Sequence, residues 1–398
     1  MKKIIFTAIN LCILISSCST DRQNTDIADS SILIDLDKIE RKDTVRTSSI
    51  FRKVRTVILE DNDSALIGNI DRIEVFDSAI FVIDAGIAKR IFVYNMEGGY
   101  IRQIGNQGRG PGEYLHMTDF CIDRDNRHVC VLDDAKKRIH RYNADNGKYA
   151  GSIKLPDDVS VNYIACNNNR FYVTVCSYDL SQRDNMMLEI DVPTSKFKMY
   201  ISAGQYNLGW NANAFSDFNF FVSKNYPFKY AGLYMNTVIA ITNDSIYPYV
   251  TLKSKDWVKK TDLLPEEEVM NGASQEVITY KKNRMERIHS YMESDGYIYF
   301  EYYQRVESYP VIYDKHTKEI RHYNFLKNDL VFGKGTPDTK FYYTTPKAAY
   351  DYLNFDRLNR ILDGIEDSTV ELASSLDKRE DIANLDRERF VIFEYEFK

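Results

Sequence analysis

The stretch FVIDAGIAKRIFVYN, residues 81–95, decides the fold because it occurs again as CVLDDAKKRIHRYN at residues 130–143, with a one-residue gap. In this alignment Tyr94 and Tyr142 lie 48 residues apart. The first copy divides into four apolar runs separated by turn residues, at 65–76, 79–84, 90–95 and 100–104. Four short strands in about 45 residues are typical of one β-propeller blade, so the sequence predicts an all-β fold of such blades.

Six blades fit the chain. At about 48 residues each, they occupy most of residues 31–398 and leave two stretches without strand patterning, 254–284 and 346–386. Apolar residues in the second stretch recur at helical spacing, which predicts a small helical insertion at about 346–386. We therefore expect one domain over 31–398, a six-bladed β-propeller with this insertion near its C-terminus.

The last apolar run, residues 389–397, predicts a terminal strand. Its expected partners are strands near the N-terminus, at 31–36 or at 52–60. Pairing of N- and C-terminal strands within one blade would close the ring. Closure removes the open sheet edge that the propeller would otherwise present.

The first residues have the pattern of an export signal. Two lysines precede a mostly apolar segment at 4–15, which is too short to span a membrane. The tetrapeptide ISSC that ends at Cys18 resembles a bacterial lipobox. This resemblance implies that residues 1–17 are a signal peptide, that Cys18 carries a lipid anchor, and that Ser19 fits export to the outer membrane. Residues 18–30 are polar and predict a flexible tether. The alternative is a plain secretory signal with an incidental cysteine.

A glycine-rich segment, GNQGRGPGEY at residues 105–114, adds a family resemblance. It resembles a loop of the six-bladed β-propeller lipoproteins of Bacteroides and related bacteria, and residues 123–142 look like an NHL-type propeller repeat. The resemblance covers essentially the whole chain after the signal, although the repeat spacing fades over 159–253. It implies a fold and a place in the cell envelope rather than an activity.

The glycine-rich segment has two interpretations, a phosphate-binding loop or a crossing between blades. A phosphate-binding loop is excluded because Pro111 stands where that motif requires a lysine. Glycines permit positive φ angles and close backbone approach, which a crossing needs. Related segments at 332–338 and 203–204 also favour an architectural role. The inter-blade loop residues are therefore predicted to be Gly108, Gly110, Pro111, Gly112 and Glu113, with Glu113 pairing with Arg109 or a neighbouring blade.

Charge and residue spacing exclude several function classes. A net charge of −6 argues against nucleic acid as a partner. The six histidines form no HxH, HExxH or Cys/His cluster, so no histidine metal site is predicted. No GxSxG elbow occurs, and no catalytic residue is assigned. Calcium is the one cofactor left open, because Asp84, Asp133 and Asp134 follow strands whose ends can face a propeller channel; the alternative is that they cap turns.

The segment at 206–230 combines aromatic residues with amides and carboxylates. Aromatic faces stack on sugar rings while amides bond the hydroxyl groups, so this composition fits a carbohydrate site. The candidate ligand-binding residues are Tyr206, Trp210, Asn211 and Asn213. The alternative, which we favour for the phenylalanines, is that the aromatic side chains pack between blades.

Two of the remaining cysteines are predicted to face each other. A two-residue turn at 125–126 would place Cys121 opposite Cys130 on the next strand. Either a cross-strand disulfide or two reduced, buried thiols fit this arrangement. No such register joins Cys166 to Cys176.

These observations predict a lipid-anchored propeller of the cell envelope, attached to the membrane through Cys18. Its expected role is to bind a glycan or an envelope protein without catalysing a reaction. The alternative function is a calcium-assisted hydrolase or lactonase that uses the propeller channel. A purely structural, scaffolding role also stays open.

Overall fold

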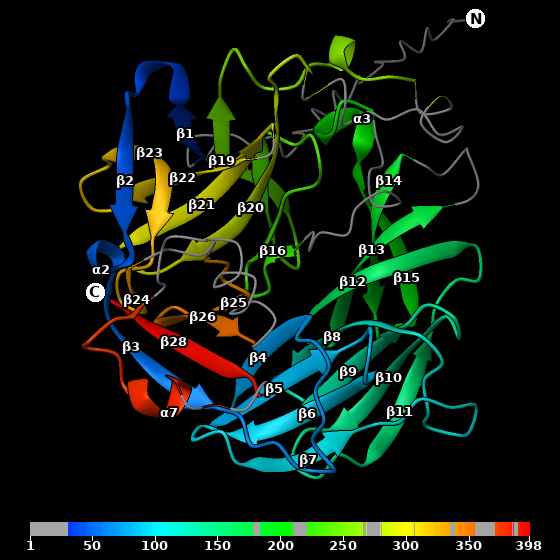
Figure 1. The fold of residues 1–398 in the computed structure, drawn as a ribbon. Coiled ribbons are helices and arrows are strands. Elements are labelled where there is room, and N and C mark those ends of the chain that lie inside the picture. Colours follow the sequence, from blue (N-terminus) through cyan, green and yellow to red (C-terminus); the bar gives the residue numbers. More distant parts are fainter. Residues whose placement is uncertain are drawn as a thin grey trace, which may run out of the picture.

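Six sheets arranged as blades around a ring make up the fold, as predicted (Figure 1). The computed structural model describes residues 31–177, 184–209, 221–265, 268, 279, 281–305, 307–334, 339–354, 371–383, 385 and 389–398. The innermost strands of the six blades surround the axis of the ring, and successive strands of each blade lie farther out (Figure 1). Side chains from all six blades line an open space on this axis, the central channel.

Blades 1 to 3 are four-stranded antiparallel sheets formed by consecutive segments of chain. From the channel outward, blade 1 contains β4 (Arg72–Phe76), β5 (Ala79–Asp84), β6 (Arg90–Asn95) and β7 (Tyr100–Ile104). Blade 2 contains β8 (Met117–Asp123), β9 (His128–Asp133), β10 (Arg138–Asn143) and β11 (Tyr149–Lys154). Blade 3 contains β12 (Val159–Asn167), β13 (Arg170–Ser177), β14 (Asn185–Asp191) and β15 (Lys196–Ser202).

Blades 4 to 6 each take one strand from the N-terminal segment. Blade 4 contains β16 (Phe221–Ser223), β17 (Phe228–Tyr230), β18 (Thr237–Ile241), β19 (Ile246–Lys253) and β1 (Ile32–Asp35). Blade 5 contains β20 (Met285–Glu293), β21 (Tyr297–Gln304), β22 (Glu307–Asp314), β23 (Ile320–Lys327) and β2 (Arg41–Arg46). Blade 6 contains β25 (Tyr343–Thr344), β26 (Ala348–Leu353), β28 (Val391–Phe397) and β3 (Phe51–Ile58).

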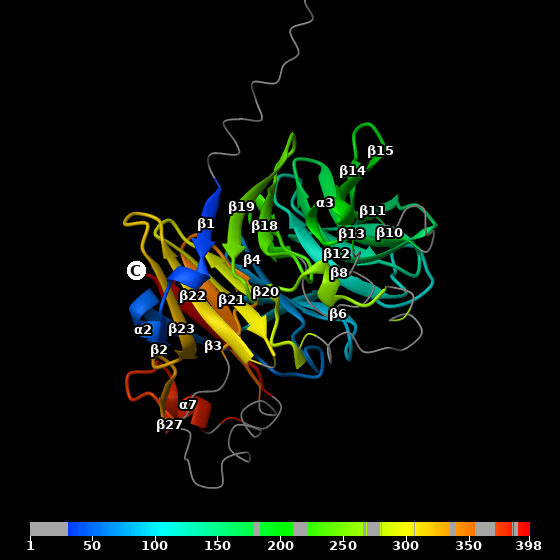
Figure 2. The same cartoon turned by 90° about the horizontal axis from the view of Figure 1, so that it is seen from above.

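The ring is closed within blade 6, as predicted. The C-terminal strand β28 pairs antiparallel with β3, with Phe393 opposite Thr56. Of the two predicted partners, the segment at 52–60 is therefore the correct one. Residues 32–35 instead form β1, which lies parallel to β19 on the edge of blade 4 (Figure 2). Strand β2 lies parallel to β23 on the edge of blade 5. The N-terminal strands β1, β2 and β3 therefore cover the outer edges of three successive blades.

The inner strands are apolar because the blades cover both of their faces. Strands β5 and β9 bury every residue except the first. A strand covered on both sides reads as a continuous apolar run rather than an alternating one. Tyr94 packs in the core between blades 6 and 1, and Tyr142 occupies the equivalent core between blades 1 and 2. The repeat in the sequence thus corresponds to a repeat in packing.

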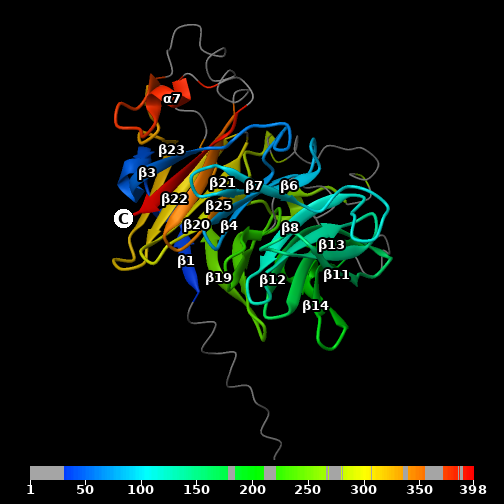
Figure 3. The same ribbon diagram turned by 90° about the horizontal axis from the view of Figure 1, so that it is seen from below.

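The predicted boundary of the helical insertion needs a correction. Residues 348–353 form strand β26, because all six are buried and pair with β28. Helix α7 (Arg379–Ala383) lies within the predicted range, at the periphery beside β3 (Figure 3). Residues 355–370 lie outside the described part of the chain. A fully buried strand has no alternating pattern, so its apolar run resembled a helix face.

Short elements occupy the junctions. They are the helices α2 (Thr47–Ile50) and α3 (Ala203–Tyr206), the 3₁₀ turns η1 (Leu36–Lys38) and η4 (Lys260–Asp262), and a two-stranded sheet of β24 (Phe332–Lys334) and β27 (Glu371–Leu372). Within the described residues, no helix combines the length and apolar character needed to cross a membrane.

Candidate functional site

The glycine-rich loop connects β7 of blade 1 to β8 of blade 2. Gly108 N donates to Tyr114 O (2.9 Å), and Tyr114 N donates to Asn106 O (3.1 Å). Gly112 needs its lack of a side chain, because its φ is +76° and a Cβ atom would lie 2.8 Å from the Tyr149 ring. The loop therefore has the architectural geometry that its composition predicted.

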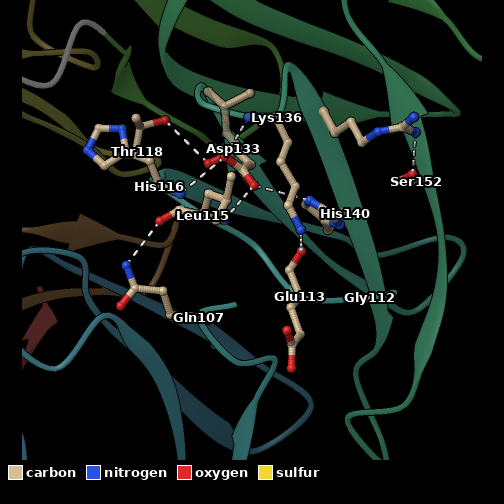
Figure 4. Close-up of polar contacts among 12 residues, drawn as sticks. Gln107, Gly112, Glu113, Leu115, His116, Thr118, Asp133, Lys136, His140 and Ser152 are labelled. Atoms are coloured by element: carbon tan, nitrogen blue, oxygen red, sulfur yellow. Dashed lines mark hydrogen bonds and ion pairs between the residues drawn. The ribbon is translucent and has the colours of Figure 1, made fainter. Parts of the chain in front are cut away.

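Glu113 stabilises its own loop. Its Oε2 accepts a hydrogen bond from Gly110 N at 2.7 Å, while its main-chain oxygen accepts one from Lys136 Nζ of blade 2 at 2.6 Å. The expected pairing with Arg109 is not among the contacts of the Glu113 carboxylate. The contact with a neighbouring blade exists, but through the backbone rather than the side chain (Figure 4).

The aspartates that the sequence suggested as calcium ligands accept hydrogen bonds from backbone amides. Both oxygens of the fully buried Asp133 carboxylate accept N–H donors, from Leu115 (2.8 Å), His116 (3.1 Å) and Lys136 (3.0 Å) (Figure 4). His140 Nε2 lies 3.3 Å from Asp133 Oδ2. Together these hydrogen bonds lower the pKa of Asp133, although burial alone would raise it.

Asp84 repeats this arrangement in blade 1. It accepts hydrogen bonds from the main-chain N–H groups of Gly68 (2.7 Å), Asn69 (2.9 Å) and Ile87 (2.8 Å). Asp134 accepts one from Val161 N of blade 3 at 2.8 Å. These contacts agree with the alternative interpretation of the sequence, in which the aspartates cap turns. Over the described residues, no group of three or more His, Cys, Asp or Glu side chains is arranged to hold a metal ion.

The predicted carbohydrate segment is only partly described. Trp210, Asn211 and Asn213 lie outside the described residues. Tyr206 ends α3, next to the outermost strand of blade 3, and packs partly buried against the core between blades 3 and 4. Phe221 and Phe228 are buried in that same core, which confirms the packing interpretation for these two phenylalanines.

A cavity of about 1270 Å³ lies at the mouth of the channel. Every blade contributes to its lining from, or next to, its innermost strand: Arg72, Asp119, Tyr163, Lys224, Ser290 and Tyr343 come from blades 1 to 6 in that order. The cavity extends along blade 5, where Tyr303 and Phe325 line it. Convergence of all blades on one opening makes it the candidate functional site of this fold.

The charged residues of the cavity wall form a buried network that spans the channel. Asp119 Oδ1 lies 2.8 Å from Arg72 Nε, and Asp119 Oδ2 lies 2.9 Å from Lys224 Nζ. The Asp119 carboxylate also accepts a hydrogen bond from Ile164 N of blade 3 at 2.9 Å. One carboxylate of blade 2 therefore connects blades 1, 3 and 4. Deeper in the channel, burial raises the pKa of Glu74, which lies 3.8 Å from Lys224 Nζ.

Aromatic side chains are available to a ligand in this cavity. Tyr163, Tyr303 and Tyr342 are partly exposed, and the Phe325 side chain is exposed over 61% of its surface. The guanidinium carbon of Arg287 lies 4.0 Å from the centre of the Tyr303 ring. The described lining contains five Lys or Arg side chains and three carboxylates. It thus favours neutral or acidic ligands over cations.

A histidine with two serine neighbours occupies the blade 5 side of the cavity. His289 Nε2 lies 3.0 Å from Ser308 Oγ, and His289 Nδ1 lies 3.1 Å from Ser290 Oγ. Ser290 has a φ of +51° at an irregularity of β20, which turns its side chain toward the cavity lining. Desolvation lowers the pKa of His289 to about 3, and the positive charges of Arg287 and Lys340 add to this lowering.

Sequence reasoning missed these cavity residues because they come from six separate blades. One signal was present: Arg72, Glu74 and Asp119 are charged residues inside short apolar strands. Charged residues are rarely buried unless they are paired. Their partner Lys224, from a blade with little repeat spacing, could not be identified from one sequence.

The fold and the cavity define a six-bladed β-propeller with a ligand-sized opening at one channel mouth. Residues 31–387 match the family described as "Domain of unknown function (DUF4934)", so the chain belongs to this family. No curated protein matches the chain.

Two solved structures of Bacteroides proteins are similar to this chain. A protein of Bacteroides fragilis that carries the description of an exported protein is 16% identical, with a TM-score of 0.68 over 92% of this chain and 99% of that chain. A DUF4221 family member from Bacteroides vulgatus is 10% identical, with a TM-score of 0.48 over 86% of this chain and 98% of that chain. At these identities, the first similarity supports the propeller fold alone.

Proposed function

We propose that this protein is a non-catalytic glycan-binding module of the cell envelope. The observation that carries the proposal is the channel-mouth cavity, in which partly exposed aromatic rings lie among hydroxyl, amide and charged groups. Sugars need an apolar face to stack on and a polar rim to hold their hydroxyl groups. A volume of about 1270 Å³ exceeds the usual small-molecule pocket and suits an oligosaccharide.

Two observations support a location in the cell envelope: the N-terminal export signal in the sequence, and the description of a protein with the same fold. The lipobox-like residues before Cys18 support a lipid anchor in the outer membrane. The B. fragilis protein with the same fold is described as exported. An envelope protein is the other partner class consistent with the cavity, and the experiment below distinguishes it from a glycan.

Thermal unfolding of the full-length protein in detergent tests the proposal. The panel contains neutral oligosaccharides, oligosaccharides with uronic acids, calcium and EDTA. A ligand at a hundred times its Kd adds about 2.7 kcal/mol to stability, which raises the unfolding midpoint visibly. A rise with at least one glycan supports the proposal. If no glycan raises the midpoint, none of the tested oligosaccharides is a ligand. The next step is then to search detergent extracts for a partner protein.

The hydrolase alternative has one observation in its favour, the contact between His289 and Ser308 in the cavity. A serine nucleophile needs a neighbouring base whose pKa lies near the operating pH. The pKa of His289, lowered to about 3, leaves its imidazole neutral but a weak base. The gap between this pKa and the operating pH favours a binding role for the cavity over a catalytic one. Ester or lactone hydrolysis that disappears in His289→Gln, or in EDTA, would reverse that preference.

A further inference from the structure

Three cysteines from two blades meet in the structure. Cys121 on β8 lies opposite Cys130 on β9, in the register that the sequence predicted. Cys166 comes from β12 of the next blade, and its Sγ lies 2.8 Å from Cys121 Sγ. The thiols of Cys121, Cys130 and Cys166 are all free. The cross-blade neighbour of Cys121 was not predicted, because the pairing of strands within a blade says nothing about contacts between blades.

The three thiols differ in their exposure to solvent. Cys121 and Cys130 are buried in the apolar core between blades 2 and 3, whereas Cys166 is partly exposed. An oxidant from solvent therefore meets Cys166 first. The blade architecture does not require cysteine at these positions, because the equivalent cross-strand pair of blade 1 is Glu74 and Phe81. The three sulfurs are also not arranged as a metal site.

We propose that Cys121 and Cys166 form a disulfide that ties blade 2 to blade 3, with Cys130 as the neighbouring third thiol. A disulfide-carrying compound, such as an envelope thiol oxidoreductase or oxidised glutathione, supplies the oxidising equivalents. The Cys166 thiolate attacks one sulfur of this compound, forming a mixed disulfide and releasing one thiolate. The Cys121 sulfur then attacks Cys166 Sγ, and the second thiolate leaves. The two thiol protons end on the two released thiolates, so one external disulfide is reduced for each disulfide formed.

Cys130 supplies a site for the Cys121 proton. Burial alone would raise the pKa of Cys130, but hydrogen bonds with the Cys121 and Cys166 thiols lower it to about 5. Burial raises the pKa of both Cys121 and Cys166, so each thiol needs a proton acceptor before it can attack. A thiolate at Cys130 next to the Cys121 thiol provides that acceptor. We expect Cys130 to accelerate formation of the disulfide without entering it.

Peptide mapping tests the pairing directly. The full-length protein is incubated with oxidised glutathione, blocked with N-ethylmaleimide and digested with trypsin. Cleavage after Arg109, Arg124, Arg127, Lys136, Lys154 and Arg170 places the three cysteines in separate peptides, 110–124, 128–136 and 155–170. The proposal predicts a linked pair of 110–124 with 155–170. A linked pair of 110–124 with 128–136, or three peptides that all carry the maleimide, would overturn it.

Variants separate the roles of the three thiols. Cys121→Ser and Cys166→Ser should both abolish the linked pair, and Cys130→Ser should keep it but form it several-fold more slowly. The oxidised wild-type protein should also unfold at a higher midpoint than the reduced protein, a shift absent from Cys166→Ser. Unchanged disulfide yield in Cys166→Ser, or a stoichiometric metal ion in the native mass of the untreated protein, would contradict the proposal. Glycan binding plays no part in these measurements.

Discussion

Lys224 Nζ lies 2.9 Å from Asp119 Oδ2, although blade 3 separates the blades that carry these two residues. Neither side chain is more than 5% exposed. A buried ion pair adds little net stability compared with apolar residues, but loss of one partner leaves an uncompensated charge. Since Asp119 also pairs with Arg72, the network fixes the relative positions of the inner strands that line the cavity.

Replacing Lys224 by methionine should destabilise the protein. The variant leaves Asp119 buried with Arg72 as its remaining cation. The expected loss in the free energy of unfolding is about 3–5 kcal/mol. Denaturant unfolding at pH 7 measures this loss. Lys154→Met is the matched control, because it removes an exposed ion pair with Asp157 and should stay within about 0.5 kcal/mol of wild type. Equal, small losses in both variants would show that the channel network has no such role.

Ring closure predicts different outcomes for two truncations. Removal of residues 391–397 deletes β28, which lies between β26 and β3, and should abolish cooperative unfolding. A chain that lacks residues 31–35 loses only the edge strand β1 and its preceding residue, and should fold with a lowered midpoint. Circular dichroism with thermal melting distinguishes the two. A folded, cooperative protein without β28 would contradict closure through blade 6.

Asp133→Asn should lower stability in a pH-dependent way. The folded-state pKa of Asp133 lies below its ordinary value of 3.8. A lowered folded pKa means that the stabilisation is present above about pH 3.8 and is lost as the pH falls below that value. With three N–H donors on the carboxylate, we expect a cost of about 2–3 kcal/mol at pH 7.

Comparison with wild type across pH checks the origin of that cost. The difference between wild type and Asp133→Asn should shrink below pH 3.8. Asp125→Asn, in the exposed turn of the same blade, should behave as wild type. A difference that stays constant down to pH 2.5 would show that the charge of Asp133 is not the cause.

The local features of blades 1 and 2 could be predicted from the sequence. Three of the four strands predicted for blade 1 match β5, β6 and β7 residue for residue, while β4 begins at Arg72 rather than at residue 65. The turn chemistry repeats too. Asn95 Oδ1 accepts hydrogen bonds from Glu97 N and Gly99 N. In the same way, Asn143 Oδ1 accepts hydrogen bonds from Asp145 N and Asn146 N.

Features that depend on long-range contacts could not be predicted. The sequence predicts a helix where β26 lies, because burial on both faces hides the alternation of a strand. The cavity, the channel network and the contact between Cys121 and Cys166 all join residues from different blades. A single sequence carries no signal that pairs them.

Substitution of Cys18 tests the membrane anchor. Cys18→Ser removes the sulfur that the lipobox interpretation modifies. The variant should leave the membrane fraction for the soluble fraction, since acyl chains contribute about 0.8 kcal/mol per buried CH₂. Fractionation with detergent-phase partitioning measures this change. Cys12→Ser is the control and should remain with the membrane. A Cys18→Ser protein that still partitions with detergent would favour a plain secretory signal or another attachment.

The cavity predicts which aromatic residues a glycan contacts. Phe325→Ala removes an exposed ring from the cavity and should weaken glycan binding at least tenfold. Phe197→Ala is the matched control, because Phe197 is 46% exposed on β15 and does not line the cavity. Trp210→Ala tests the predicted carbohydrate segment in the same way. Loss of binding in Trp210→Ala alone would move the site from the cavity to that segment.

The most direct test of glycan binding at the channel mouth is calorimetric titration of the oligosaccharide panel into full-length wild type, Phe325→Ala and Phe197→Ala. If glycans bind in the cavity, at least one should bind wild type and Phe197→Ala with the same affinity, and should bind Phe325→Ala at least tenfold more weakly. Equal affinity for all three proteins, or heat from none of the glycans, would contradict it.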